Sequence, residues 1–134
     1  MSSRGELLEN IEYGRAGDFS LRMDAHIPNG AGRFPAAIIV HGGGWVRGDR
    51  RVGVEPLFRP LSDSGFAWFS ISYRLANDIT GSNVRDIPIS LFQGGAIQDV
   101  RQAIAHVKAR AHAHSHGRRT SCLSVRNVSG YGLI

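Results

Sequence analysis

A short apolar run that ends in three consecutive glycines constrains this chain more than any other feature. The run is Ala36–Val40, and it is followed directly by His41, Gly42, Gly43, Gly44 and Trp45. An apolar run of this length that stops at turn residues predicts a buried strand, and glycine lets the following backbone turn tightly and approach a ligand closely. The N–H groups of such a turn can converge on one point and stabilise an oxyanion that develops in acyl transfer.

Further segments predict a small α/β arrangement. Residues 65–75 are apolar, aromatic and β-branched, and they predict a second buried strand. Between the two strands, residues 55–64 predict a helix, which Pro60 should kink or shorten. Residues 98–107 predict another helix, with an apolar face at helical spacing. That face consists of Val100, Ala103, Ile104 and Val107.

The segment before these elements predicts a hairpin of antiparallel strands. Residues 11–13 are one strand candidate, and residues 19–25 alternate between apolar and polar side chains as a half-buried strand does. Residues 28–32 predict a loop, and a longer surface loop is expected between Gly81 and Pro88.

Taken together, these motifs resemble the α/β-hydrolase carboxylesterases. The segment from His41 to Trp45 is similar to their HGGG-type loop. Residues 48–50, Gly-Asp-Arg, follow at a familiar spacing, and residues 72–75 resemble the YRL signature of the hormone-sensitive-lipase-like members. The resemblance covers residues 10–109 and implies the N-terminal portion of an α/β-hydrolase sheet, in which an antiparallel edge hairpin leads into parallel strands with flanking helices. The sheet is expected to be incomplete.

The resemblance also implies a chemistry. A serine carboxylesterase acts on a small-molecule ester, needs no metal or cofactor, and uses the N–H groups of Gly42, Gly43 and Gly44 for the oxyanion. His41 is expected to bind its own loop and to contact the substrate rather than to act as a base, and Trp45 is expected to line the substrate pocket. An amide hydrolase related to kynurenine formamidase has a similar loop and is the alternative.

Several charged or polar residues have a structural interpretation. Asp49 is expected to pin the loop through Arg50 or Arg51, and Tyr73 and Arg74 to hold neighbouring loops at a strand end. Asp99 is expected in the first turns of its helix, where a carboxylate is favourable to the helix dipole.

The family pattern weakens after Lys108. A G-x-S-x-G nucleophile elbow is expected near residue 127, and Ser129 is the nearest serine, after a weak strand candidate at residues 122–125. Asn127 and Tyr131 stand where the elbow needs glycine, so a turn serine is the better interpretation. No acid and histidine follow in the order of this fold. We therefore divide the chain into residues 1–109 and a basic tail, 110–134. The hypothesis is a truncated or frame-shifted esterase fragment that is inactive alone and self-associates through an exposed sheet edge.

Charge and composition limit the kinds of binding partner that are expected. The chain carries a net +5, but all eleven acidic residues fall at or before Asp99, so the first hundred residues carry −1 and the rest +6. A basic tail is not a basic face, so no nucleic-acid partner is expected. The chain has no apolar run long enough for a membrane, and its single cysteine, Cys122, fits the cytoplasm. Zinc or nickel binding by His112, His114 and His116 on one face of a strand is a weaker alternative, because a helix or coil fits this segment equally well, and no metal is expected.

Overall fold

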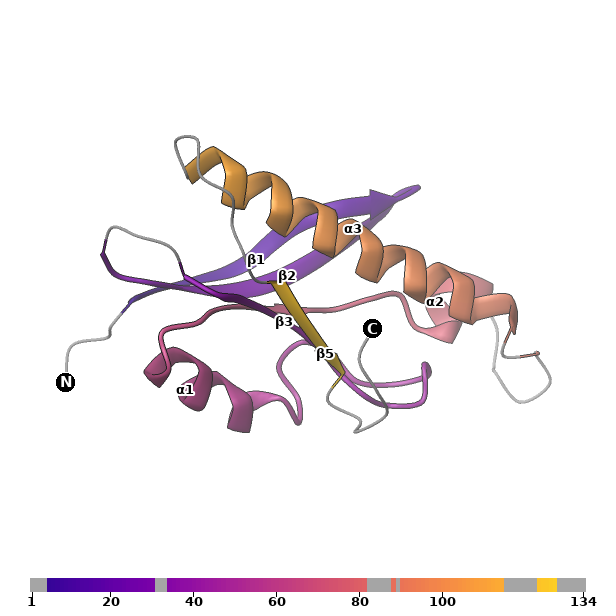
Figure 1. Cartoon of the computed structure of the whole chain (residues 1–134). Helices are drawn as coiled ribbons and strands as arrows, with labels where there is room; N and C mark the ends of the chain where they lie inside the picture. The colour runs from indigo at the N-terminus through magenta and orange to yellow at the C-terminus, as the bar shows by residue number, and fades with distance from the viewer. Residues whose placement is uncertain (1–4, 31–33, 82–87, 89, 115–122, 128–134) are drawn as a thin grey trace.

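The computed structural model describes residues 5–30, 34–81, 88, 90–114 and 123–127. These residues form one five-stranded sheet with helices on both faces (Figure 1). In chain order the elements are β1 (Gly5–Ala16), β2 (Phe19–Pro28), β3 (Ala36–Val40), α1 (Glu55–Asp63), β4 (Ala67–Ile71), α2 (Ala76–Thr80), α3 (Ser90–His114) and β5 (Leu123–Asn127).

The strand order is β1-β2-β4-β3-β5, with β1 and β5 at the two edges of the described sheet. β1 and β2 form an antiparallel hairpin, and β2 pairs antiparallel with β4. β3 is parallel to both β4 and β5. The predicted architecture, an antiparallel edge hairpin that leads into parallel strands, is therefore confirmed.

Alternating side chains of β3 divide the core into two layers. Ile38 and Val40 pack into the cluster under α3, whereas Ala37 and Ile39 pack with Trp68 into the cluster under α1. Figure 1 shows α3 and α1 on opposite sides of the sheet. A strand that is buried on both faces reads as a continuous apolar run, which is why residues 36–40 were identifiable from sequence.

The predicted apolar face of α3 is confirmed. Val100, Ala103 and Val107 are buried, and Ile104 packs partly buried against the same cluster. The predicted helix at residues 55–64 is also confirmed to within one residue, with Pro56 in its first turn and Pro60 inside it.

Three elements differ from expectation. β1 is much longer than residues 11–13, since it follows β2 along its whole length. α3 begins at Ser90 rather than near residue 98. Its first turns were not predicted, because Gly94 and Gly95 interrupt the apolar periodicity there. A side chain at Gly95 would lie 2.7 Å from Ile79 Cδ1, so glycine lets α3 approach α2. α2 itself has five residues, too short for a periodic pattern.

The predicted tail also contains regular structure. α3 continues past residue 109 to His114, and β5 covers part of the weak strand candidate at residues 122–125. β5 pairs with β3 in register, with Ala36 opposite Leu123 and Val40 opposite Asn127. The division at residue 109 stays a prediction, although it does not coincide with the end of a helix.

Candidate functional site

The loop after β3 has a backbone that only glycine adopts easily. The φ angles of Gly43 and Gly44 are 127° and 64°. A Cβ atom at Gly43 would lie 1.9 Å from the carbonyl oxygen of Arg47, so any side chain there would collide with the backbone. Trp45 also has a positive φ, 71°, which is costly for a bulky residue. Strain of this kind collects at functional sites, where surrounding contacts enforce it.

Those contacts are made by the carbonyl groups of the loop. The His41 carbonyl accepts from the Tyr73 hydroxyl at 2.8 Å, and the Gly42 carbonyl accepts from His41 Nδ1 at 2.7 Å. The Gly43 carbonyl accepts from the N–H of Val46 at 3.3 Å. Three consecutive carbonyl groups are thus bound to the protein.

This arrangement directs the N–H groups of the three glycines away from those partners. In a trans peptide the C=O of one residue and the N–H of the next point in opposite directions, and no cis peptide occurs in the described chain. Among the described residues, no hydrogen bond uses the N–H of Gly42, Gly43 or Gly44. The described contacts of the loop thus hold its carbonyl groups and leave these three N–H groups unused.

His41 is part of the support for the loop. It is only 2% exposed, and its ring stacks on Tyr73 with a centroid distance of 4.3 Å. Burial lowers the pKa of His41 and outweighs the opposing effects of the Gly42 carbonyl and Asp49. A neutral ring with its proton on Nδ1 leaves Nε2 as an acceptor, which has no partner among the described residues. The geometry agrees with the structural interpretation of His41, and its contact with substrate stays a prediction.

Trp45 connects the loop to the segment after β4. Its partly buried ring lies 5.8 Å from the Tyr73 ring, tilted by 59°, and its carbonyl accepts from the N–H of Ala76 at 2.8 Å. Its place in the wall of a substrate pocket stays a prediction.

The residues after the loop fold back on it. Gly48 has φ 103°, and a Cβ there would lie 2.5 Å from His41 Nδ1 and 2.6 Å from the Gly42 carbonyl oxygen. Asp49 accepts from the backbone N–H groups of Arg51 and Val52 at 2.7 and 3.0 Å. These hydrogen bonds are the main reason that the pKa of Asp49 is lowered. Asp49 therefore pins the loop as expected, through backbone groups rather than arginine side chains.

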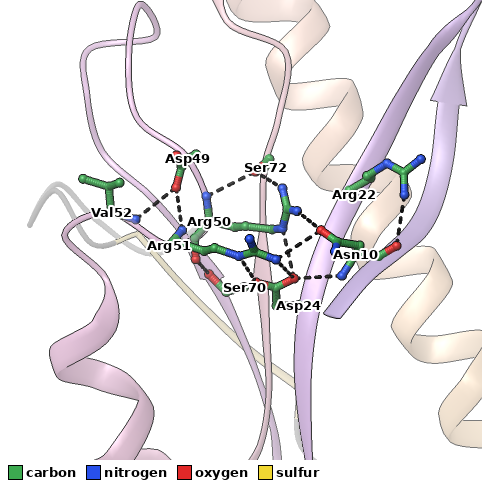
Figure 2. A network of polar contacts seen from close by, with 9 residues as sticks. All are labelled: Asn10, Arg22, Asp24, Asp49, Arg50, Arg51, Val52, Ser70 and Ser72. Carbon is green, nitrogen blue, oxygen red and sulfur yellow. Dashed lines mark hydrogen bonds and ion pairs between the residues drawn. The ribbon is translucent and has the colours of Figure 1, made fainter. Parts of the chain in front are cut away.

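Sequence reasoning missed Asp24, which anchors Arg50 and Arg51 (Figure 2). Asp24 is 5% exposed and accepts from Arg50 Nε at 3.1 Å and from Arg51 Nε at 2.7 Å. The alternation along β2 puts Asp24 on the polar face, where a carboxylate is expected to be solvated. The loop after β3 covers that face, and no local pattern in the sequence signals the coverage.

Arg74 and Asp99 form a second buried ion pair. Arg74 Nη2 lies 2.9 Å from Asp99 Oδ1, and the Arg74 backbone N–H donates to Asp99 Oδ2 at 2.9 Å. Asp99 is completely buried. The expected position of Asp99 in the first turns of a helix is wrong, because α3 begins at Ser90. Its expected structural role agrees with this pairing, as does that of Arg74.

The predicted nucleophile, Ser129, lies outside the described residues. The carboxyl ends of β3 and β5 do meet at one edge of the sheet, since Val40 pairs with Asn127. Of the alternatives for the histidine segment, a helix holds at His112 and His114, because α3 continues through both, and His116 lies outside the described residues. No group of three metal-binding side chains occurs within the described part of the chain.

A mixed sheet with an antiparallel entry hairpin, parallel strands after it and a glycine loop after the first parallel strand is the arrangement of the N-terminal part of an α/β-hydrolase fold. The sequence agrees, because residues 23–124 match the BD-FAE family, an α/β-hydrolase esterase family. The match covers more than half of the chain, which therefore belongs to this family.

Solved structures with the same fold are esterases. The Pyrobaculum calidifontis esterase aligns with a TM-score of 0.66 and 23% identity, over 91% of this chain and 34% of that one. A bacterial heroin esterase aligns with a TM-score of 0.63 and 25% identity, over 92% of this chain and 34% of that one. A truncated carbohydrate esterase from gut microbiota aligns with a TM-score of 0.65 and 20% identity, over 95% of this chain and 41% of that one. The chain thus spans roughly a third to two fifths of these proteins.

Two curated relatives are much larger proteins. The non-reducing polyketide synthase ausA of Penicillium brasilianum is 35% identical over 77 residues, which are 54% of this chain and 3% of the synthase. The synthase Preu3 of Preussia isomera is 32% identical over 84 residues, 60% of this chain and 3% of the synthase.

Among the helices that the structure describes, none is long and apolar enough to cross a membrane.

Proposed function

We propose that this chain carries the oxyanion side of a serine ester hydrolase. The observation that supports the proposal is that the carbonyls of His41, Gly42 and Gly43 are bound, whereas no hydrogen bond among the described residues uses the N–H groups of Gly42–Gly44. Donors that are fixed before the reaction stabilise the charge of a tetrahedral intermediate without further reorganisation. Each such donor typically contributes about 3–4 kcal/mol to catalysis.

In the proposed reaction a serine hydroxyl attacks the carbonyl carbon of a small-molecule ester. The carbonyl oxygen gains the negative charge and accepts hydrogen bonds from the loop N–H groups. Collapse of the intermediate releases the alcohol, and water then releases the acid. Ser129 is the candidate nucleophile, but Asn127 and Tyr131 replace the elbow glycines. We therefore propose that the chain binds acyl oxyanions and is inactive alone.

Binding of a carboxylate product tests the loop without requiring a complete triad. We expect titration with butyrate to shift the amide resonances of Gly42, Gly43 and Gly44 in a ¹⁵N-labelled chain. Gly43→Ala should weaken binding about tenfold or more, because its Cβ would collide with Arg47. Gly17→Ala is the matched control, since Gly17 has φ 60° with nothing within 4 Å of its Cβ position. Unchanged butyrate binding in Gly43→Ala would contradict the proposed role of the loop.

A turnover assay tests the second half of the proposal. We expect p-nitrophenyl butyrate to be hydrolysed no faster with the chain than in buffer. Hydrolysis that Ser129→Ala abolishes would show instead that the chain holds a working nucleophile. The same assay with a formylated aromatic amine separates ester from formamide hydrolysis.

A further inference from the structure

We propose that Asp24 is a positioning residue for the oxyanion loop, acting through Arg50; this inference rests on the function proposed above. Asp24 belongs to β2, and no contact joins it to Gly42, Gly43 or Gly44 among the described interactions. Its influence passes through the residues that follow the loop.

Asp24 lies on the face of the sheet that is turned away from α3. Asp24 pairs with Ser70 across β2 and β4, between the pairs that Met23 forms with Ile71 and Ala25 with Phe69. Met23 and Ile71 belong to the cluster under α3. By alternation, Asp24 and Ser70 lie on the opposite face of the sheet. The segment at Arg50 covers this face, because the Ser70 hydroxyl donates to the Arg50 carbonyl at 2.6 Å.

Hydrogen bonds from several strands converge on Arg50 (Figure 2). Its Nε donates to Asp24, and its Nη2 donates to the side-chain oxygen of Asn10. Its backbone N–H and its Nη1 both donate to Ser72 Oγ at 3.1 Å. Together with the Ser70 contact, these bonds fix both the backbone and the side chain of Arg50 to β1, β2 and the end of β4.

An irregularity in β1 brings Asn10 to both Asp24 and Arg50. The register of the hairpin shifts between Leu8 and Ile11, and Asn10 in this interval has φ 57°. The Asn10 backbone N–H donates to Asp24 Oδ1 at 2.9 Å. Bulges re-aim side chains and are frequent beside active sites. Here the irregularity brings both a donor for Asp24 and an acceptor for Arg50 to the same point.

Arg50 is connected to the glycine loop through Gly48. Gly48 lies two residues before Arg50, and its backbone packs on His41 and the Gly42 carbonyl. A displacement of Arg50 would therefore move Gly48, and with it the peptide whose N–H belongs to Gly43. Misplacement of about 1 Å by a remote change can cost a large factor in the function of a site.

The charge of Asp24 also favours a positioning role over a purely stabilising one. Burial of a carboxylate is costly, and apolar residues of similar volume often replace a buried ion pair without loss of stability. Burial raises the pKa of Asp24, but the hydrogen bonds from Arg51, the Asn10 backbone and Arg50 outweigh it and hold the pKa below its usual value. A charged, directional contact restrains Arg50 to one geometry, which an apolar contact would not.

The test compares Asp24→Asn with Asp63→Asn in the full chain. Asp63 forms an exposed ion pair with Arg59 on α1, with an N–O distance of 3.8 Å, and serves as the matched control. In Asp24→Asn we expect shifted amide resonances at Gly42–Gly44, faster hydrogen exchange at Ala76, whose N–H binds the Trp45 carbonyl, and about tenfold weaker butyrate binding. Asp63→Asn should change none of these.

A second variant covers the case in which Asp24→Asn fails to fold. Arg50→Lys keeps the charge and removes the planar guanidinium group, so it should reproduce the loop shifts and the weaker binding. Folded Asp24→Asn or Arg50→Lys with unchanged Gly42–Gly44 resonances and unchanged Ala76 exchange would overturn the positioning role. If these signals change but the wild-type chain does not bind butyrate, the positioning role is supported and the proposed function fails instead.

Discussion

Gly48 should be among the least replaceable residues of the chain, although it lies outside the glycine triplet. Its φ of 103° is outside the regions that residues with side chains populate readily, and strain of this kind costs about 1–3 kcal/mol. The Cβ of Gly48→Ala would also lie 2.5 Å from His41 Nδ1 and 2.6 Å from the Gly42 carbonyl oxygen. Overpacking of this kind adds about 1–3 kcal/mol. Gly48→Ala should therefore lower the free energy of unfolding by about 2–6 kcal/mol.

Neither contacting atom can move away cheaply. The two atoms bond to each other at 2.7 Å, and the His41 carbonyl is bound by Tyr73. Urea unfolding followed by tryptophan fluorescence measures the loss. Gly17→Ala provides the comparison, because Gly17 has φ 60° in open space and should cost only about 1–2 kcal/mol. If Gly48→Ala costs no more than Gly17→Ala, the packing of residue 48 on the loop has no energetic importance.

Two further predictions concern titratable side chains. Asp99→Asn should lower the free energy of unfolding by about 3–5 kcal/mol in urea, because it leaves the Arg74 guanidinium without its buried partner. The exposed control, Asp63→Asn, should cost less than about 1 kcal/mol. Equal losses in the two variants would refute the importance of the buried ion pair. The lowered folded-state pKa of His41 means that the unfolded chain binds the proton first, so the free energy of unfolding should fall as the pH drops below 6.5. His41→Gln should reduce the slope of the free energy of unfolding against pH. His106→Gln should reduce it too, since the pKa of His106 is also lowered, chiefly by burial. An unchanged slope in His41→Gln would show that His41 does not remain neutral in the fold.

The parts of the fold that were predictable are those with a local signal. The strand at residues 36–40 is buried on both faces, and the apolar spacing of Val100, Ala103 and Val107 is that of a helix. The start of α3 was not predictable, because Gly94 and Gly95 break the apolar periodicity there, and at Gly95 the approach of α2 favours glycine. Tertiary contact decides this case against local propensity.

The candidate site divides in the same way. The glycine loop was visible in the sequence, since few residues other than glycine accept its backbone angles. Asp24 was not, because it lies 26 residues from Arg50 and only the folded sheet brings them together. The positions of Ser129 and of a substrate, self-association through a sheet edge, and the cytoplasmic location stay predictions.

The glycine loop and the segment at residues 72–75 form one structural unit, which gives a physical reason for their joint occurrence in the sequence. The Tyr73 hydroxyl binds the His41 carbonyl, and the N–H of Ala76 binds the Trp45 carbonyl. A loop that keeps its N–H groups free, as we propose for this one, is fixed through its carbonyls and side chains; Val46 and the His41 ring bind two of these carbonyls from within the loop, and the other two partners come from the segment after β4. Because β3 and β4 are parallel, the segment after β4 and the loop after β3 both lie at the carboxyl end of these strands. The loop is therefore defined as much by the residues after β4 as by its own three glycines.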